Sequence, residues 1–523
     1  MNNFKLKIIF PPGWTLCSGS PHIAIALLNG YLKSQGIRVS IEDSNFESIK
    51  NKAKINALTA FTSCENRTLE DMNKPYFAIE DELMDMSSKY NGQWNVQIGF
   101  TFNDNPQFSS SEAFKAIDRD SPFDNYYKNV LIKSILNEDS NVLGFCIASI
   151  NQIIPALRIS KLLRENDYEG FIVFGGNTVS RLINELSIPS IFNIIDGLII
   201  YQGEIPLFEL CKAISEKTSL ENIPQLIWKN EKGKIIINNI CSKLNLNLVS
   251  PPDYTQLNIG EYWGANYLNI VASRGCYHGK CNFCAIPFGW GNNGYAGIRS
   301  PKNVFEDITT LIERHGINRF KFVDESLPPS FMRRIAEMLL LENLTIEWEA
   351  YTRLEREWYD KTFVSLIAKA GFKKGYFGLE LFPSENRKML NKNDYADPYT
   401  LLSLCNDYGI KVHLFCMFGF PRTGEKEAFQ TLEFILENKE KIDTVDIFPW
   451  TYARHTNIDG VKPIKKKSQD WALEYDHISL GEDVLSSDEI TSLSLNIEEI
   501  IWDEMPVLLH PTYRLISPWS YNC

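Results

Sequence analysis

The stretch RGCYHGKCNFCAIPFGWG, residues 274–291, places three cysteines within nine residues. They are Cys276, Cys281 and Cys284, and a histidine, His278, lies between the first two. In a reducing compartment disulfides are rare, so a tight group of thiols is typical of metal or redox chemistry. The first question about this chain is therefore what three thiolates hold.

Three interpretations of the motif compete. Cys276, His278, Cys281 and Cys284 could form a Cys3His zinc site, but structural zinc sites usually pair two CxxC knuckles and the sequence has no second one. The thiols could be unrelated core residues, but the flanking glycines, lysine and asparagine indicate a loop. The third interpretation is a [4Fe–4S] cluster, which normally takes four thiolates. Three thiolates leave one iron open for a substrate, and we favour this interpretation.

Composition and net charge limit the classes of protein to which this chain can belong. The chain has 523 residues, 44% of them hydrophobic, and two to four domains are expected at this length. Its net charge is 53 − 65 = −12, whereas a protein that follows the nucleic-acid backbone more often carries a basic domain. No stretch reaches the roughly 18 apolar residues of a membrane span, and the N-terminus lacks a signal-peptide pattern. We expect a cytoplasmic protein with no nucleic-acid partner and no membrane span.

The first part of the chain alternates between buried strands and helices. Strands are predicted at residues 4–10, 37–43, 141–149, 170–177 and 195–204. This alternation predicts a parallel, doubly wound sheet, which binds ligands at the carboxyl ends of its strands. Residues from about 51 to 140 are poorly patterned, and residues 213–262 indicate a hairpin followed by a proline-containing linker.

A second alternating region follows. Its candidate strands cover residues 267–273, 319–325, 346–353, 373–382, 411–421 and 444–452. Six strand–helix units in about 190 residues predict a partial barrel. Asp324, Glu325, Arg353 and Glu380 gather just past the strand ends, the edge at which such barrels place their chemistry.

The cysteine motif resembles the signature loop of radical S-adenosylmethionine (SAM) enzymes. That loop usually reads CxxxCxxC with an aromatic residue before the last cysteine; Phe283 matches the aromatic, while the first gap here has four residues instead of three. Three later blocks resemble the family in the same order: VDESLPPSF (323–331), YFGLELFPSENRKMLNK (376–392) and MFGFPRTGEKEAFQTLEFI (417–435). The chain is therefore identified as similar to this family.

The resemblance implies a site. Cys276, Cys281 and Cys284 would hold the cluster, and its open iron would chelate the amino and carboxylate groups of SAM. The SAM-binding residues implied are Phe283, Asp324, Glu325, Arg353, Gly378 and Glu380. Among them Glu380 would contact the ribose, Arg353 the carboxylate and the Asp324–Glu325 region the amino end. For Arg353 and Glu380 an ordinary barrel ion pair is the alternative, and the role of His278 stays open.

The first region resembles the cobalamin-binding domain of class B radical SAM proteins. VLGFCIAS and GFIVFGGNTVS are similar to its GxS and GGP core, and YQGE (201–204) stands where GEGE is usual, with two substitutions. The cobalamin-binding residues implied are Ser149, Gly175, Gly176, Gly203 and Glu204. The DxHxxG motif that supplies a cobalt ligand in many cobalamin proteins is absent, so His22 is better interpreted as a helix N-terminal or partly buried histidine. A cobalamin fold that has lost its cofactor is the alternative.

The predicted fold class is α/β: an N-terminal doubly wound, Rossmann-like cobalamin-binding domain, then a partial (β/α)6 TIM-like radical SAM barrel and a short C-terminal region. The predicted boundaries are 1–212 with the insert at about 51–140, 213–262 for the hairpin and linker, 263–455 for the barrel and 456–523 for the C-terminal region. This last region either packs on the barrel, which we favour, or lines the substrate pocket. Cys523 is a thiol of the site or, by default, part of a frayed terminus.

The resemblance implies a cobalamin-dependent radical SAM enzyme. We expect a methyltransferase that acts on an unactivated carbon of a natural-product or peptide substrate through a 5′-deoxyadenosyl radical. Its cofactors would be a [4Fe–4S] cluster, SAM and methylcobalamin, with an electron donor such as flavodoxin or ferredoxin. The alternatives are cyclisation or rearrangement, RNA modification without methyl transfer from cobalamin, and a non-enzymatic metal-binding protein.

Overall fold

The computed structural model describes residues 4–14, 19–50, 88–90, 94–95, 101–239, 244–262, 267–291, 294–383, 385, 389–392, 397–479 and 485–504. The chain divides into two compact units. The first unit is Met1–Gly264 with Lys466–Leu473, and the second is Ala265–Lys465 with Glu474–Cys523.

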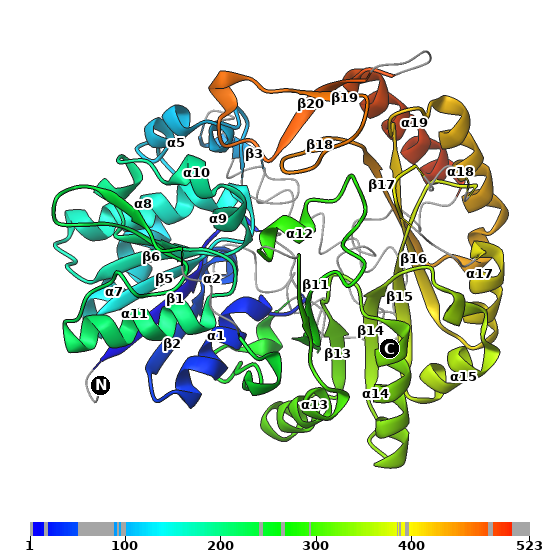
Figure 1. The fold of residues 1–523 in the computed structure, drawn as a ribbon, viewed down its shortest axis with the longest axis horizontal. Coiled ribbons are helices and arrows are strands. Elements are labelled where there is room, and N and C mark those ends of the chain that lie inside the picture. The colour runs from blue at the N-terminus through cyan, green and yellow to red at the C-terminus, as the bar shows by residue number, and fades with distance from the viewer. Residues whose placement is uncertain are drawn as a thin grey trace. The chain divides into compact units, whose positions relative to one another are not determined.

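The first unit is built on a seven-stranded sheet with the strand order β2-β1-β5-β6-β7-β8-β9 (Figure 1). Its strands are β1 (Lys5–Phe10), β2 (Arg38–Asp43), β5 (Val142–Cys146), β6 (Phe171–Gly175), β7 (Gly197–Ile199), β8 (Leu226–Lys229) and β9 (Ile235–Ile237). The pairings among β2, β1, β5, β6 and β7 are all parallel, whereas β8 pairs with β7 and with β9 in the antiparallel sense. The predicted hairpin therefore extends the first sheet.

Helices cover both faces of this sheet. The longer ones are α1 (Ile23–Ser34), α2 (Ser44–Lys50), α5 (Ser110–Ala116), α7 (Ile132–Glu138), α8 (Ile153–Glu165) and α11 (Glu204–Glu216). Shorter ones are α6 (Asp124–Tyr126), α9 (Asn177–Arg181) and α10 (Ile183–Leu186), with a π-helical turn at Tyr127–Leu131 and 3-10 turns at Pro106–Phe108, Ile150–Gln152, Ile191–Asn193, Leu246–Leu248 and Ile259–Glu261. Leu6, Ile8 and Phe10 of β1 join a core with residues of α1 and α11, while Ile9 is buried on the opposite face. All five residues of β5 are buried, which explains its uninterrupted apolar run.

A short segment from late in the chain completes the first unit. Residues 466–473 include the 3-10 turn Lys467–Gln469 and the fully buried Trp471. The Trp471 backbone N–H donates to the carbonyl of Phe108 at 2.9 Å, and its indole Nε1 donates to the carbonyl of Glu185 at 3.2 Å. Asp470 accepts the backbone N–H of Ser110 at 2.8 Å. This return segment is therefore hydrogen-bonded into the first unit, although it lies more than 200 residues beyond that unit's main stretch.

The second unit contains a six-stranded, all-parallel sheet with the order β10-β13-β14-β15-β16-β17 (Figure 1). The strands are β10 (Leu268–Ile270), β13 (Arg319–Phe322), β14 (Glu347–Thr352), β15 (Phe372–Glu380), β16 (Lys411–Phe418) and β17 (Thr444–Pro449). In the described part of the chain β10 and β17 do not pair with each other, so the sheet is an open, partial barrel. The predicted α/β class, with a doubly wound sheet and a partial barrel, is confirmed.

Helices pack on one face of the second sheet. They are α13 (Pro301–His315), α14 (Pro329–Leu341), α15 (Lys361–Lys369), α17 (Pro398–Asp407), α18 (Glu425–Glu437) and α19 (Ser487–Glu504), with the single turn α12 (Ile286–Gly289) and 3-10 turns at Arg356–Tyr359 and Lys439–Lys441. The local sequence sets their ends: Ser300 caps α13 and Pro301 fills its first turn, while Gly316 ends it. Among the described residues no helix has the length and apolarity needed to cross a bilayer.

Three small sheets complete the structure. They pair β11 (Ser273–Gly275) with β12 (Tyr295–Ile298), β20 (Glu474–Ser479) with β18 (Tyr452–Ala453) and β19 (Val461–Ile464), and β3 (Trp94–Asn95) with β4 (Thr101–Phe102). The hairpin of β11 and β12 brackets the cysteine motif and thus sets the two ends of its loop.

Candidate functional site

The cysteine motif forms a loop after β10, at the carboxyl edge of the second sheet. Cys276, Cys281 and Cys284 are partly exposed, whereas the other described cysteines are buried. Gly275 opens the loop with φ +79°, where a side chain would collide with the carbonyl of Gly294. In the described part of the chain no three His, Cys, Asp or Glu side chains are grouped as for a single metal ion. The loop thus presents three accessible thiols at the edge where a barrel places its chemistry.

Asp324 and Glu325 hold the two ends of this loop. The carboxylate of Asp324 accepts the backbone N–H groups of Ala272 at 3.1 Å and Ser273 at 2.5 Å, and the Ser273 hydroxyl at 2.5 Å. Burial raises the pKa of Asp324 to about 6, although these hydrogen bonds oppose the rise. At the other end, Glu325 accepts the indole N–H of Trp290 at 3.3 Å. Both acidic residues therefore brace the cysteine loop.

Residues 389–392, which we call the docking segment, accept further hydrogen bonds from the cysteine loop. The backbone and side-chain amides of Asn282 donate to two carbonyl oxygens of this segment, at 3.1 and 2.9 Å. His278 Nε2 donates to the carbonyl of Asn391 at 2.9 Å. Because a carbonyl only accepts, Nε2 of His278 carries the hydrogen and does not serve as a metal ligand in this conformation. His278 thus contributes a loop contact, which the sequence left open.

The docking segment also holds Glu380. Lys392 Nζ donates to the carbonyl of Gly378 and to Glu380 Oε1, both at 2.6 Å. Lys392 and Glu380 are each 7% exposed. Glu380 has φ +59°, a left-handed conformation that a non-glycine residue rarely adopts and that typically occurs at functional sites. One short segment therefore joins the cysteine loop to the residue expected to contact SAM ribose.

Arg353, which follows β14, lies beside the cysteines. Its Nη1 is 4.0 Å from Cys281 Sγ, and its Nε is 3.4 Å from Glu355 Oε1, which also accepts the Tyr277 hydroxyl at 2.6 Å. Burial raises the pKa of Cys281, while the positive charges of Lys392 and Arg353 oppose the rise. These two cations favour a thiolate at this position.

The structure gathers the residues predicted in the second unit around this loop. The Phe283 ring packs edge-on against Phe420, with centroids 5.1 Å apart, and burial raises the pKa of Cys284 to about 12. Tyr277, Glu355 and Lys392 were missed by sequence reasoning. Lys392 is the last residue of the block 376–392 that resembles the family, and this resemblance was the sequence signal that could have pointed to it.

The residues predicted for the first unit follow the carboxyl ends of its strands. Ser149 comes after β5, Gly175 ends β6 and Gly176 follows it, Gly203 precedes α11, and Glu204 is the first residue of α11. Ser149 caps the next turn by accepting the N–H of Asn151. Gly176 has φ +114°, and a side chain there would meet the carbonyl of Ile147, so the turn itself requires glycine. These five residues share one edge of the sheet.

The YQGE loop at this edge is strained and incompletely hydrogen-bonded. Tyr201, where the resembled motif has glycine, adopts φ +62°. Among the described residues, Gln202 Oε1 and the nearby Thr178 Oγ1 are buried atoms without a hydrogen-bond partner.

His22 caps α1 at the same edge. Its Nδ1 accepts the N–H of Ala24 at 3.3 Å, and its ring stacks on Phe10 with centroids 4.3 Å apart. Burial lowers the pKa of His22 to about 4, so the ring is neutral at pH 7. The predicted helix N-terminal position of this histidine is confirmed.

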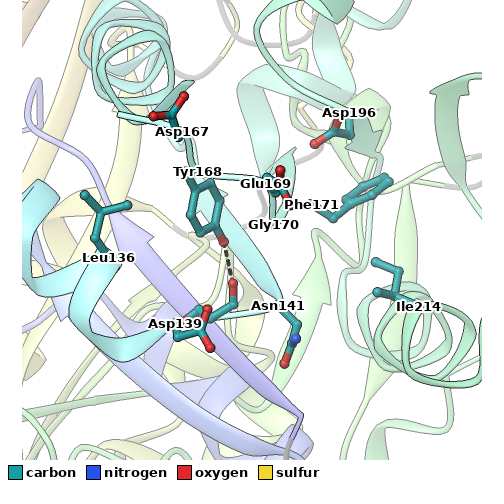
Figure 2. Close-up of a pocket in the computed structure, with 11 residues that line it drawn as sticks. Leu136, Asp139, Asn141, Asp167, Tyr168, Glu169, Gly170, Phe171, Asp196 and Ile214 are labelled. Atoms are coloured by element: carbon teal, nitrogen blue, oxygen red, sulfur yellow. Dashed lines mark hydrogen bonds between the residues drawn. The ribbon is translucent and has the colours of Figure 1, made fainter. Parts of the chain in front are cut away.

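A pocket of about 550 Å³ opens at the opposite edge of the first sheet (Figure 2). Its lining comprises Leu136, Asp139, Ser140, Asn141, Asp167, Tyr168, Glu169, Gly170, Phe171, Asp196 and Ile214. Figure 2 shows the Tyr168 hydroxyl bonded to the carbonyl of Ser140, at 2.8 Å. Asp196 is already paired with Arg164 at 2.5 Å. The pocket lies at the starts of β5 and β6, away from the edge that carries the predicted residues.

Comparison with known proteins gives a family match within the second unit. The model of the radical SAM superfamily matches residues 270–435. The bacteriochlorophyllide d C-12(1)-methyltransferase of Chlorobaculum tepidum is 25% identical over 205 residues, 37% of this chain and 43% of that protein. The anaerobic magnesium-protoporphyrin IX monomethyl ester cyclase of Rubrivivax gelatinosus is 28% identical over 166 residues, 31% of this chain and 28% of that protein. The matches cover less than half the length of each relative.

Two solved structures share the fold of nearly the whole chain. The radical SAM methyltransferase TsrM from Kitasatospora setae, with cobalamin and a [4Fe–4S] cluster bound, has a TM-score of 0.59 at 13% identity, covering 94% of this chain and 90% of that one. The cobalamin-dependent SAM radical enzyme OxsB, with aqua-cobalamin and SAM bound, has a TM-score of 0.58 at 15% identity, covering 97% of this chain and 58% of that one. At these identities the likeness is one of fold.

Proposed function

We propose that the protein is a cobalamin-dependent radical SAM methyltransferase acting on an unactivated carbon. Its residues 270–435 match the radical SAM superfamily. The observation that carries the proposal is the loop of three accessible thiols at the carboxyl edge of an open parallel sheet. The shared fold with TsrM and OxsB over 94% and 97% of the chain supports the cobalamin part.

Cys276, Cys281 and Cys284 would hold a [4Fe–4S] cluster. When bound, the cluster would supply the one-electron reductive cleavage of SAM. The chain's own residues prepare the loop: Asp324 holds its start, and the docking segment holds its middle. The nearby Arg353 and Lys392 stabilise the thiolate of Cys281.

The SAM-binding residues we propose are Phe283, Asp324, Glu325, Arg353, Gly378 and Glu380. Arg353 is 6% exposed, and its guanidinium Nη1 lies 4.0 Å from Cys281 Sγ. Its fork of donors suits the methionine carboxylate. The Glu380 carboxylate, held by Lys392, would accept ribose hydroxyls. Asp324 already uses both oxygens on the loop backbone, so its contribution is to position that loop.

Cobalamin would bind at the carboxyl edge of the first sheet, through Ser149, Gly175, Gly176, Gly203 and Glu204. It supplies the methyl group when bound. The residues fit, because Gly175, Gly176 and Gly203 leave three positions at this edge without side chains. Nδ1 of His22 already accepts a backbone N–H, so we assign no cobalt ligand to this histidine.

The substrate we propose is a small molecule or a peptide, and the electron donor a flavodoxin or ferredoxin. TsrM has been solved with tryptophan and a SAM analogue, and one curated relative acts as a methyltransferase on a bacteriochlorophyllide. The second curated relative is a cyclase, which keeps ring closure as the alternative reaction. The mass of the product separates the two, because methyl transfer adds a CH2 unit.

The first experiment is anaerobic purification of the full chain with cluster reconstitution and added hydroxocobalamin. Iron and cobalt are quantified, and 5′-deoxyadenosine is measured after addition of SAM and reductant. Cys281→Ala should lose the cluster and all 5′-deoxyadenosine. Cys405→Ala, which changes a buried cysteine of α17 outside the loop, is the matched control and should retain both.

Each outcome has a distinct meaning. Cluster, cobalamin and SAM cleavage in the wild type, with the cluster and SAM cleavage lost only in Cys281→Ala, would support the proposal. Cluster and SAM cleavage without cobalamin would overturn methyl transfer and leave the radical SAM assignment. Stoichiometric zinc without SAM cleavage would overturn both.

A further inference from the structure

The first gap of the cysteine motif holds four residues, YHGK at 277–280, where the resembled motif has three. His278 and the carbonyl of Lys280 are hydrogen-bonded to Asn391, at 2.9 and 2.8 Å. Tyr277 contacts a different element: its hydroxyl donates to Glu355 Oε1 at 2.6 Å, in the segment between β14 and α15. The lengthened gap is therefore tied to two separate parts of the second unit.

Glu355 connects Tyr277 to Arg353. The oxygen that accepts the Tyr277 hydroxyl also lies 3.4 Å from Arg353 Nε. On the other side of the same guanidinium, Nη1 lies 4.0 Å from Cys281 Sγ. A guanidinium is planar and holds its donors in a fixed fork, so a partner at Nε sets the direction of the remaining donors. Tyr277 thus reaches Arg353 through one shared carboxylate oxygen.

The charges show that this arrangement serves geometry. The negative charge of Glu355 by itself weakens the attraction between Arg353 and a bound carboxylate. A partner of this charge therefore benefits carboxylate binding only by fixing the guanidinium in a useful orientation. The Tyr277 hydroxyl holds Glu355 in place and leaves the net charge of the site unchanged.

We propose that Tyr277 is a positioning residue, which orients Arg353 toward the carboxylate of SAM through Glu355. This inference rests on the proposed function. It gives a role to a residue of the lengthened gap, which neither the cysteine motif nor the resemblance assigned, and it places neither Tyr277 nor Glu355 in contact with SAM.

The test uses Tyr277→Phe, which removes the hydroxyl and keeps the ring and the net charge. Tyr399→Phe is the matched control, because the Tyr399 hydroxyl of α17 donates to the Glu437 carboxylate of α18 at 3.1 Å, away from the cysteine loop. Each full-length variant is reconstituted and its iron is quantified. Equilibrium dialysis then measures the affinity for SAM and for decarboxylated SAM, which lacks the carboxylate.

We expect Tyr277→Phe to keep its iron and to bind SAM about fivefold more weakly, the effect of about one hydrogen bond. Its affinity for decarboxylated SAM should stay within about twofold of the wild type, a selectivity that a merely structural role would not produce. In an Arg353→Lys background the loss of the hydroxyl should have no further effect on SAM binding, because lysine has no Nε donor for Glu355 to orient. Tyr399→Phe should leave both affinities unchanged.

Several results would overturn the inference. Loss of iron in Tyr277→Phe would show that the hydroxyl serves the cysteine loop itself. Equal weakening of SAM and decarboxylated SAM, or a fivefold effect that persists in the Arg353→Lys background, would show that Arg353 is not involved. If the wild type binds SAM and Tyr277→Phe binds it equally well, this inference fails alone. If the reconstituted wild type binds no SAM, the proposed function fails together with the inference.

Discussion

The two parallel sheets of this protein differ in what their faces carry. In the first sheet helices cover both sides, and β5 is buried at every position. In the second sheet one face is apolar, with Phe320, Phe322 and Trp348 fully buried, while the other carries charged and polar side chains. Residues of this polar face include Lys321, Glu349, Lys374, Tyr376, His413, Thr444 and Asp446.

The difference determines where each sheet can do chemistry. A sheet buried on both faces has almost only strand ends at which polar groups reach a ligand, so the candidate residues of the first unit all lie at or just after the ends of its strands. The second sheet holds a polar network on its inner face: Lys321 Nζ lies 3.4 Å from Glu349 and 3.2 Å from the Tyr376 hydroxyl. Lys374 is paired with Asp443 at 2.5 Å. Lys321, Glu349, Lys374 and Tyr376 lie within β13, β14 and β15, before the carboxyl ends of these strands.

A buried lysine in each sheet allows the comparison to be tested, and its loss is the largest effect we expect on stability. Lys321→Met would leave the Glu349 carboxylate, which is 0% exposed, without its cation, at a cost of about 3–5 kcal/mol. Lys7→Met in β1 should cost only about 1–2 kcal/mol, because its partners Glu42 and Glu138 remain 18% and 35% exposed. Urea unfolding of both variants measures the two costs, and equal costs would show that the two faces do not differ in this respect.

Lys392→Met tests the link between the cysteine loop and Glu380. Removing the ammonium leaves a carboxylate with 10% side-chain exposure unpaired, so we expect a loss of about 3 kcal/mol in stability and about tenfold weaker SAM binding. Equilibrium dialysis with SAM on the reconstituted protein measures the second effect. Lys392→Arg should recover most of it, and unchanged SAM affinity in Lys392→Met would contradict the proposed role of the pair.

The pH dependence of the first unit should reveal Asp43, at the end of β2. Burial raises the pKa of Asp43 to about 6, against hydrogen bonds from the Phe46 N–H and the Tyr262 hydroxyl. Between about pH 4 and 6 the folded chain then binds more protons than the unfolded one, so stability falls as the pH rises, by at most about 3 kcal/mol. Asp43→Asn should remove this fall in unfolding experiments from pH 4 to 7. Parallel curves for the two proteins would refute the assignment.

Tyr201→Gly should have the smallest effect. Glycine relieves the left-handed φ of +62° but also makes the unfolded chain more flexible, so the net stabilisation lies between zero and about 1 kcal/mol. Thermal unfolding measures it. Tyr201→Ala keeps the cost of the left-handed φ and serves as the control. If Tyr201→Ala stabilised the protein as much as Tyr201→Gly, the left-handed φ would not be the cause of the gain.

The strands of both sheets were predictable because each is an apolar run or an alternation of apolar and polar residues, bounded by turn residues. The expected strand at 319–325 corresponds to β13, and that at 346–353 to β14. The attachment of β8 and β9 to the first sheet was not predictable, since pairing partners depend on the whole sheet. Of the poorly patterned stretch from about 51 to 140, residues 101–140 form short helices, while most of the rest lies outside the described residues, as do Cys523 and the aromatic C-terminal run.

The cysteine loop and its neighbours at the strand ends were also predictable, because local spacing sets them. The contacts of the docking segment were not predictable. Its hydrogen bond with His278 joins residues 113 positions apart, and the local sequence pattern does not indicate such a contact. The pairing of Lys392 with Glu380 depends on the same approach of distant segments. Sequence reasoning therefore found the groups expected to touch ligands and missed those that hold them in place.

The return segment has a practical consequence for anyone dividing this protein into fragments. A recombinant piece that stops at residue 264 would lack Trp471 and the hydrogen bonds to Phe108 and Glu185. A single proteolytic cut between residues 264 and 265 would leave residues 466–473 of the first unit on the other fragment. A chimaera that exchanges one unit for that of another protein would have to exchange this eight-residue piece as well.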